Sequence, residues 1–117
     1  MDMPRPGEET ARRFGRLAAR FNDRAQRGQM FGMPVLKVGG KVFAGTFGDA
    51  MTFKLGSADL ERALGATGVE PFEPMGRRMK EWVLVPVEHA RAWSRLAEQA
   101  FANATPPGRT RRPTAGR

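Results

Sequence analysis

The sequence contains no cysteine, no tyrosine and only one histidine, His89. Without cysteine the chain can form no disulfide, no thiolate zinc site and no thiol nucleophile, so its core must depend on apolar packing. One histidine and scattered acidic residues leave few side chains suited to general acid-base or nucleophilic catalysis. We therefore expect a non-enzymatic protein with no cofactor and no bound metal, and the lack of cysteine favours a cytoplasmic location.

Long apolar runs are also missing. No stretch approaches the roughly 18 apolar residues of a membrane span, and residues 1–7 contain no apolar core of a signal peptide. We expect neither export nor a membrane partner. Apolar residues make up 40% and charged residues 27% of the 117 residues, a composition typical of one folded globular domain.

Acidic residues are absent from segment 105–117, which contains four arginines among proline, glycine and threonine. The chain has a net charge of +8, so half of the excess lies in this segment and half in residues 1–104. Because such a composition cannot build a core, we predict a folded domain at 1–104 and a disordered basic tail at 105–117. Its candidate nucleic-acid contacts are Arg109, Arg111 and Arg112.

Apolar residues recur at three- and four-residue spacing from about Glu8 to Ala25, which predicts a first helix with one buried stripe. Gly28 is the predicted stop. On the same segment, arginines also repeat at helical spacing and are expected to form one stripe beside the buried face. These candidate nucleic-acid contacts are Arg13, Arg16, Arg20, Arg24 and Arg27. The simpler interpretation is a solvated surface whose aliphatic stems cover apolar edges.

Short β-type segments follow, beginning near Phe31 and separated by the pairs Gly39-Gly40 and Gly48-Asp49. A tight hairpin turn needs positive φ at its two central residues, so paired glycines predict a hairpin. Together these signals indicate three antiparallel strands, the last ending near Leu55.

A second helix is predicted after Ser57, which can serve as its N-cap. An ordered loop is predicted at 71–78, because its prolines exclude a helix, and Phe72 and Met75 are expected to anchor it. Residues 79–85 form a further predicted strand, ended by Pro86, and apolar spacing then predicts a continuous last helix to Ala104. The predicted fold class is α+β, a two-layer antiparallel sheet with helices packed on it in the order α-β-β-β-α-β-α.

A set of short motifs occurs along the chain in a characteristic order and spacing. These motifs are Met30-Phe31-Gly32, Gly40-Lys41-Val42-Phe43-Ala44, Phe53-Lys54-Leu55, Pro71-Phe72, Met79, Trp82 and Val85-Pro86. In this order they resemble the N-terminal domain of TfoX/Sxy-type competence regulators, and the resemblance extends from the first helix to Ala104. It implies a two-layer α/β domain with no known enzymatic activity. Full-length regulators add a C-terminal helical domain, whereas this chain ends in the arginine-bearing tail.

Other motifs have plainer interpretations. His89 has no second histidine or cysteine to share a metal and is expected to be a partly exposed helix residue. The segment Gly39-Gly40-Lys41 lacks the earlier glycine and the following hydroxyl of a phosphate-binding loop, so a hairpin turn accounts for it. A second basic cluster, Arg77, Arg78 and Lys80, could be functional or simply a soluble loop.

Three functions remain as hypotheses. The first is a non-enzymatic binding or regulatory module that acts through protein contacts, with an unknown protein partner and homodimer formation, because the strands have apolar residues on both faces. The alternative is a nucleic-acid-binding accessory protein that uses the first-helix stripe and the tail for weak, non-specific contact. An enzyme is the third hypothesis, and the lack of catalytic side chains opposes it.

Overall fold

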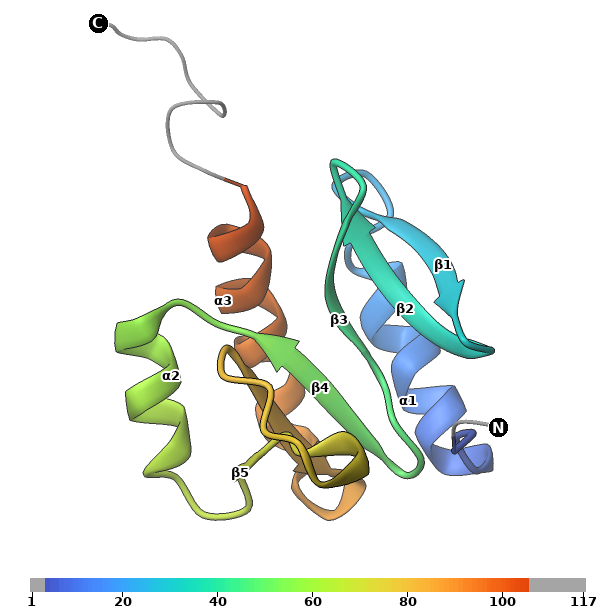
Figure 1. Cartoon of the computed structure of the whole chain (residues 1–117). Helices are drawn as coiled ribbons and strands as arrows, with labels where there is room; N and C mark the ends of the chain where they lie inside the picture. The colour runs from blue at the N-terminus through green and yellow to red at the C-terminus, as the bar shows by residue number, and fades with distance from the viewer. Residues whose placement is uncertain (1–3, 106–117) are drawn as a thin grey trace, which may run out of the picture.

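The computed structural model describes residues 4–105, which form three α-helices, two short 3-10 helices and six strands (Figure 1). The α+β class with an antiparallel sheet was therefore predicted correctly. In chain order the elements are α1 (Glu8–Ala19), β1 (Gln26–Met30), β2 (Met33–Val38), β3 (Lys41–Thr46), β4 (Ala50–Lys54), α2 (Ser57–Leu64), β5 (Glu70–Pro71), η1 (Pro74–Gly76), β6 (Trp82–Pro86), η2 (Val87–Ala92) and α3 (Trp93–Ala104).

Within the sheet the strands follow the order β1-β2-β3-β4-β6-β5, and every neighbouring pair is antiparallel. The predicted sequence of elements is retained as α1, β2, β3, β4, α2, β6 and α3. Strands β1 and β5 are additions at the two edges of the sheet. Neither segment shows the apolar alternation of a strand in its sequence, because β1 is largely exposed and polar and β5 has only two residues.

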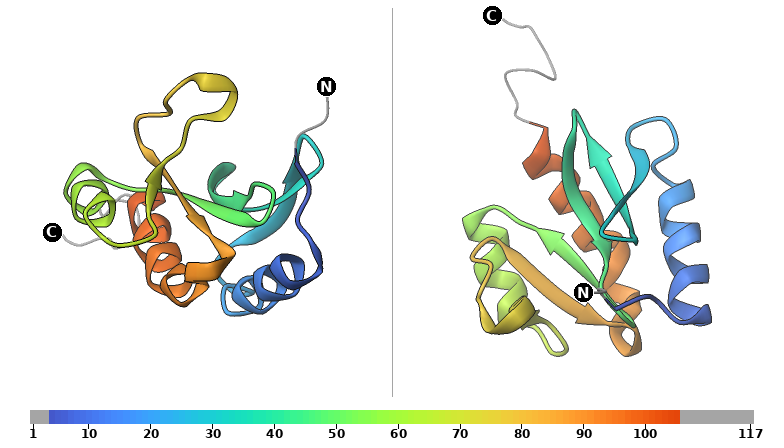
Figure 2. Two further views of the ribbon diagram at one scale, coloured as in Figure 1. Left: turned by 90° about the horizontal axis from the view of Figure 1, so that it is seen from below. Right: turned by 45° about the vertical axis from the view of Figure 1, so that its right-hand side comes forward.

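One face of the sheet is covered by α1 and α3, and we call it the covered face (Figure 2, left). Helix α2 lies beside α3, since residues of both helices line one shallow surface hollow. In the middle of the covered face, Met51 and Phe53 of β4 lie opposite Val85 and Val83 of β6, and all four side chains are fully buried. This centre is the apolar core of the domain.

A β-bulge in the β2–β3 pair directs Phe43 to the covered face. Leu36 pairs with Ala44 and Lys37 pairs with Val42, so Phe43 is the extra residue between two registers. Bulged strands turn a side chain away from simple alternation. As a result Phe43 and Ala44 are both buried, and the Phe43 ring lies 5.7 Å from Phe21 and 5.6 Å from Phe101, measured between ring centroids.

Two polar contacts fix the helices to the sheet. The indole N–H of Trp93, at the start of α3, donates a buried 3.1 Å hydrogen bond to the Val85 carbonyl of β6. At the start of α1, a carboxylate oxygen of Asp49 accepts hydrogen bonds from the Gly7 N–H (2.7 Å) and the Thr10 hydroxyl (3.0 Å). Asp49 lies in the β3–β4 turn, so a residue far along the chain caps the helix and places negative charge at the positive end of its dipole.

The first helix ends at Ala19, so its predicted extension to Ala25 is wrong. Backbone N–H groups of Arg20 and Phe21 bond three residues back, to Leu17 and Ala18, and residues 20–24 form a turn. Asn and Asp compete with the helix by favouring turn conformations, and residues 22–23 are such a pair. Gly28, the predicted stop, lies instead within β1, where the Lys37 side chain packs over it.

Three further boundaries differ from the prediction. Strand β6 begins at Trp82 rather than Met79, since residues 79–81 belong to the loop before it. The last helix is interrupted, because the 3-10 helix η2 precedes α3 and has a kink at His89 (φ −116°, ψ 28°). Ser57 is the first residue of α2 and makes no capping hydrogen bond, and Gly56 occupies the N-cap position.

Candidate binding surfaces

Two hairpin turns of the sheet have the same backbone but different residues. In the β2–β3 turn, Gly39 and Gly40 have φ of 58° and 80°. In the β1–β2 turn, Phe31 and Gly32 have φ of 54° and 82°. Positive φ at both central residues is typical of primed two-residue turns, in which Asn-Gly and Gly-Gly are the preferred pairs. The β1–β2 turn therefore places a bulky aromatic residue where the backbone favours asparagine or glycine.

Phe31 gains nothing from packing in return. Its side chain is 77% exposed, although a phenylalanine in water loses the free energy that burial would supply. A non-glycine residue in the left-handed region costs about 1 kcal/mol or more. Neither backbone preference nor core packing accounts for this residue.

The loop between β5 and β6, residues 72–81, repeats this combination at Met75. We call it the η1 loop. Met75 has φ 57° and ψ 32°, and its side chain is 78% exposed. Among residues 4–105, Phe31 and Met75 are the non-glycine residues with positive φ, and they are also the two most exposed large apolar side chains. We call these two residues the apolar tips.

The η1 loop is ordered by its own contacts. The Met79 N–H donates to the Phe72 carbonyl (2.9 Å), and the Trp82 N–H donates to the Met79 carbonyl (3.0 Å). The Phe72 ring packs edge-on against Phe47, with centroids 5.0 Å apart, and lies 6.5 Å from Trp82. These rings anchor the base of the loop, while its tip extends into solvent.

The η1 loop, which contains Met75, extends from the sheet on the side away from α1 and α3, and we call this side the helix-free face (Figure 2, left). Pairing places Val35, Gly45, Thr52 and Leu84 in one row across this face, because directly opposed residues share a face. Gly45 leaves room for Val35, since a Cβ there would lie 2.7 Å from a Val35 methyl group. Leu84 and Trp82 remain partly exposed, so this face is apolar and only partly covered.

The predicted arginine stripe is not one helical face, because α1 ends before its last members. Arg13 and Arg16 lie on α1, Arg20 is its C-cap, and Arg24 and Arg27 belong to the following turn and to β1. The fold still brings three of the five together: Arg13, Arg16 and Arg20 line a surface hollow of about 150 Å³ with Leu17, Ala90, Trp93 and Ser94.

Within this hollow the charges are unevenly compensated. Arg13 forms a 2.9 Å ion pair with Glu9 one turn earlier on α1. Among residues 4–105, Arg16 and Arg20 form no ion pair. These two guanidinium groups are therefore the ones available to an anionic ligand.

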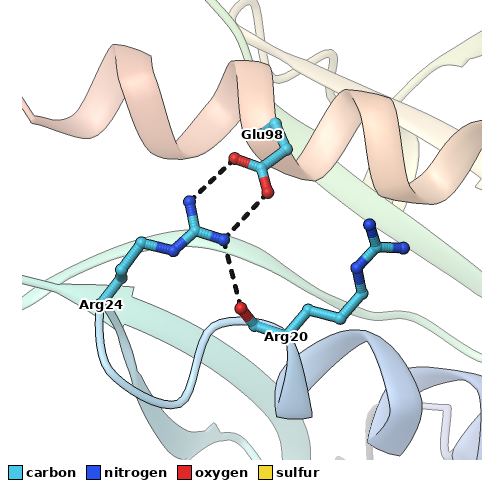
Figure 3. A network of polar contacts seen from close by, with 3 residues as sticks. All are labelled: Arg20, Arg24 and Glu98. Carbon is cyan, nitrogen blue, oxygen red and sulfur yellow. Dashed lines mark hydrogen bonds and ion pairs between the residues drawn. The ribbon is translucent and has the colours of Figure 1, made fainter.

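Arg24 is engaged in a structural contact instead (Figure 3). Its two terminal nitrogens donate to the two carboxylate oxygens of Glu98 on α3 at 3.0 and 2.9 Å, and one also donates to the Arg20 carbonyl at 3.2 Å. The hydrogen bond from Arg24 lowers the pKa of Glu98, and the same bond raises the pKa of Arg24. The guanidinium also lies 4.3 Å from the Phe21 ring centroid, so Arg24 joins α3 to the turn after α1.

The remaining predicted site residues are placed as follows. Arg27 points toward α1, with its guanidinium carbon 5.8 Å from the Phe14 ring centroid. Arg109, Arg111 and Arg112 lie outside the described residues, so the tail contact stays a prediction. His89 packs against Gly68, where any Cβ would collide with the imidazole ring.

The apolar tips were missed by sequence reasoning as functional residues. Phe31 was assigned to a strand and Met75 to a loop anchored by its own side chain. A signal existed for Phe31, because Phe-Gly stands between two β segments where a turn pair such as Asn-Gly is expected. Met75 precedes Gly76, but its left-handed conformation depends on the loop as folded.

No helix within residues 4–105 is long and apolar enough to cross a membrane. In the same part of the chain, no three His, Cys, Asp or Glu residues lie close enough to hold a metal ion. No protein-family model, no curated protein and no solved structure matches the chain.

Proposed function

We propose that this chain is a non-enzymatic binding or regulatory module that acts through protein-protein contacts, with the apolar tips as its principal contacts. One observation carries the proposal: within residues 4–105, the two non-glycine residues with a left-handed backbone are also the two most exposed large apolar side chains. Strained residues persist where function requires them, and exposed apolar groups mark interaction sites.

The neighbouring residues support a contact surface rather than two isolated side chains. Met30 precedes the first tip and Met79 follows the second, and these side chains are 42% and 41% exposed. Methionine is flexible and polarisable, and it adapts to differently shaped partners. The exposed methionines beside each apolar tip enlarge the apolar surface that a partner can contact.

A second copy of the chain is the first partner we propose, since paired copies commonly cover such surfaces with two-fold symmetry. The proposed setting is the cytoplasm. The proposal also agrees with the resemblance to the N-terminal domain of TfoX/Sxy-type regulators, for which no enzymatic activity is known.

The test compares the wild type with a Phe31→Asn, Met75→Gly double variant. Both changes suit a left-handed backbone, so we expect the free energy of unfolding to rise by about 1 kcal/mol while binding is lost. Sedimentation across micromolar concentrations measures self-association, and affinity capture from lysate compares the proteins retained by each chain. A less stable variant, or one that self-associates and retains partners as the wild type does, would contradict the proposal.

Nucleic-acid binding is the second candidate, because Arg16 and Arg20 line one hollow and form no ion pair in the described part of the chain. Fluorescence anisotropy with a short DNA duplex at low salt tests it. We expect Arg16→Glu with Arg20→Glu to abolish binding and Arg77→Glu with Arg78→Glu to reduce it less. Equal loss in both variants would indicate attraction to net charge alone.

A further inference from the structure

The η1 loop combines apolar and cationic groups around one depression. Pro74, Met75 and Met79 line it together with Arg77 and Arg78, and the exposed lining is mostly apolar. Methionine side chains from both limbs of the loop therefore flank a concave surface with two guanidinium groups at its margin.

The cations of this loop are not neutralised by the domain. Within residues 4–105, the ion pairs involve Arg13, Arg24, Lys54 and Arg62, and none involves Arg77, Arg78 or Lys80. The adjacent acid Glu81 pairs with Lys54 at 3.5 Å. The loop also contains Glu73, which forms no ion pair within residues 4–105, so the loop has three cations against two acids and keeps a modest positive excess beside its apolar depression.

We infer that the η1 loop binds a polypeptide segment in which a large apolar side chain is flanked by acidic residues. The apolar side chain would occupy the depression between Met75 and Met79, and the flanking carboxylates would pair with Arg77 and Arg78. Guanidinium groups bind carboxylates with two parallel hydrogen bonds, which also orients the segment. This inference rests on the proposed function and specifies the chemistry of the partner.

The shape of the surface favours a peptide over a lipid membrane. A peptide side chain can enter the depression between Met75 and Met79, whereas a membrane would be contacted only by the protruding Met75 side chain. The backbone hydrogen bonds at Phe72 and Met79 hold the loop before any ligand arrives, so less ordering free energy is lost on binding.

The probe is a capped synthetic peptide, Asp-Glu-Leu-Phe-Asp-Glu, titrated into the full chain. Methyl NMR signals of the methionines report the site and the affinity. We expect the Met75 and Met79 methyl signals to shift, and affinity to fall at least about tenfold in Arg77→Glu with Arg78→Glu. Met75→Gly should weaken binding similarly without lowering the melting temperature, and Met75→Asn repeats this test with a second residue suited to the left-handed backbone.

The matched control carries the same change in net charge at two exposed arginines outside both candidate surfaces, as Arg12→Glu on α1 with Arg91→Glu on η2, and should bind the peptide as the wild type does. Equal weakening in this control would overturn the inference, as would a wild type that shows no binding. Vesicles of about three parts phosphatidylcholine to one part phosphatidylserine provide the other arm. Met75-dependent binding to vesicles but not to peptide would also overturn it.

The experiments distinguish failure of the peptide-binding inference from failure of the proposed function. If the peptide does not bind but the Phe31→Asn, Met75→Gly variant loses self-association or partners, the chain is a binding module whose partner has other chemistry. If the peptide binds and that variant keeps every partner, the loop is a peptide site without the wider role.

Discussion

The two tryptophans of the chain lie on opposite faces of the sheet. Trp93 packs beneath the covered face, is 2% exposed and donates its indole N–H to Val85. Trp82 lies on the helix-free face, remains partly exposed, and its ring lies 6.5 Å from the Phe72 ring, measured between centroids. The same strands thus supply a covered face with a fully buried centre and a face on which Trp82 and Leu84 remain partly exposed.

The β2–β3 and β1–β2 turns differ in a similar way, since one contains residues that favour its backbone and the other does not. At Gly39-Gly40 the residues suit the backbone, whereas at Phe31-Gly32 a bulky exposed side chain stands in the same conformation. Stability explains the covered face and the first of these turns. It does not explain Phe31 or Met75, and this is why we propose these two residues as binding contacts.

The largest expected effect contrasts the tryptophans. Trp93→Ala should lower the free energy of unfolding by about 3–5 kcal/mol, because it leaves a cavity and an unpaired carbonyl under the sheet. Trp82→Ala should cost about 1–2 kcal/mol, because part of that ring is already in water. Chemical denaturation measures both. Equal losses would show that the helix-free face is as much a part of the core as the covered face.

The second-largest expected effect on stability concerns the contact that holds the start of α1 to the β3–β4 turn. Asp49→Ala removes the acceptor for the Gly7 N–H and the Thr10 hydroxyl, and should cost about 0.5–2 kcal/mol. Asp59→Ala is the control, since Asp59 pairs with an exposed arginine of its own helix. Thermal melts of both variants decide the matter, and a smaller loss at Asp49 than at Asp59 would contradict the capping role.

The turns can be exchanged to sharpen the comparison. Gly39→Phe gives the β2–β3 turn the residue pair of the β1–β2 turn and should cost about 1 kcal/mol, through strain at positive φ. Because no binding role is assigned to that turn, peptide affinity and self-association should not change. Urea midpoints and sedimentation report the two properties, and a neutral effect on stability would remove strain as the argument for Phe31.

The smallest effect concerns the contact between Arg24 and Glu98. Since the folded pKa of Glu98 is lowered, its contribution is fully present above the unfolded glutamate pKa and is lost as pH falls through the folded pKa. Both side chains are over a third exposed, at 40% and 46%, so the contribution should be less than about 1 kcal/mol. The stability difference between the wild type and Glu98→Gln should shrink below about pH 4. A difference that stays constant into acid would exclude the ion pair as its cause.

Much of the fold was predictable from local pattern. The Gly39-Gly40 hairpin, the β3–β4 turn at Gly48-Asp49 and the alternation of Val83 and Val85 with Trp82 and Leu84 all follow from residues close in the chain. Strand β1 was not predictable in this way, because its polar residues have no strand period and it exists only through pairing with β2. The end of α1 was missed for a related reason, since Phe21 and Ala25 keep helical spacing in a turn.

The sequence by itself determined the fold class, the main hairpin and the apolar stripes of the helices, because periodicity and turn chemistry act over a few residues. Only the tertiary structure decided which arginines share a hollow, which one pairs with Glu98 across 74 positions, and which apolar side chains remain in solvent. Those outcomes depend on which strands and helices, distant in the sequence, become neighbours in the folded domain. For Phe31 and Met75, the combination of exposure and left-handed backbone that indicates binding exists only once the surrounding strands and loop have folded.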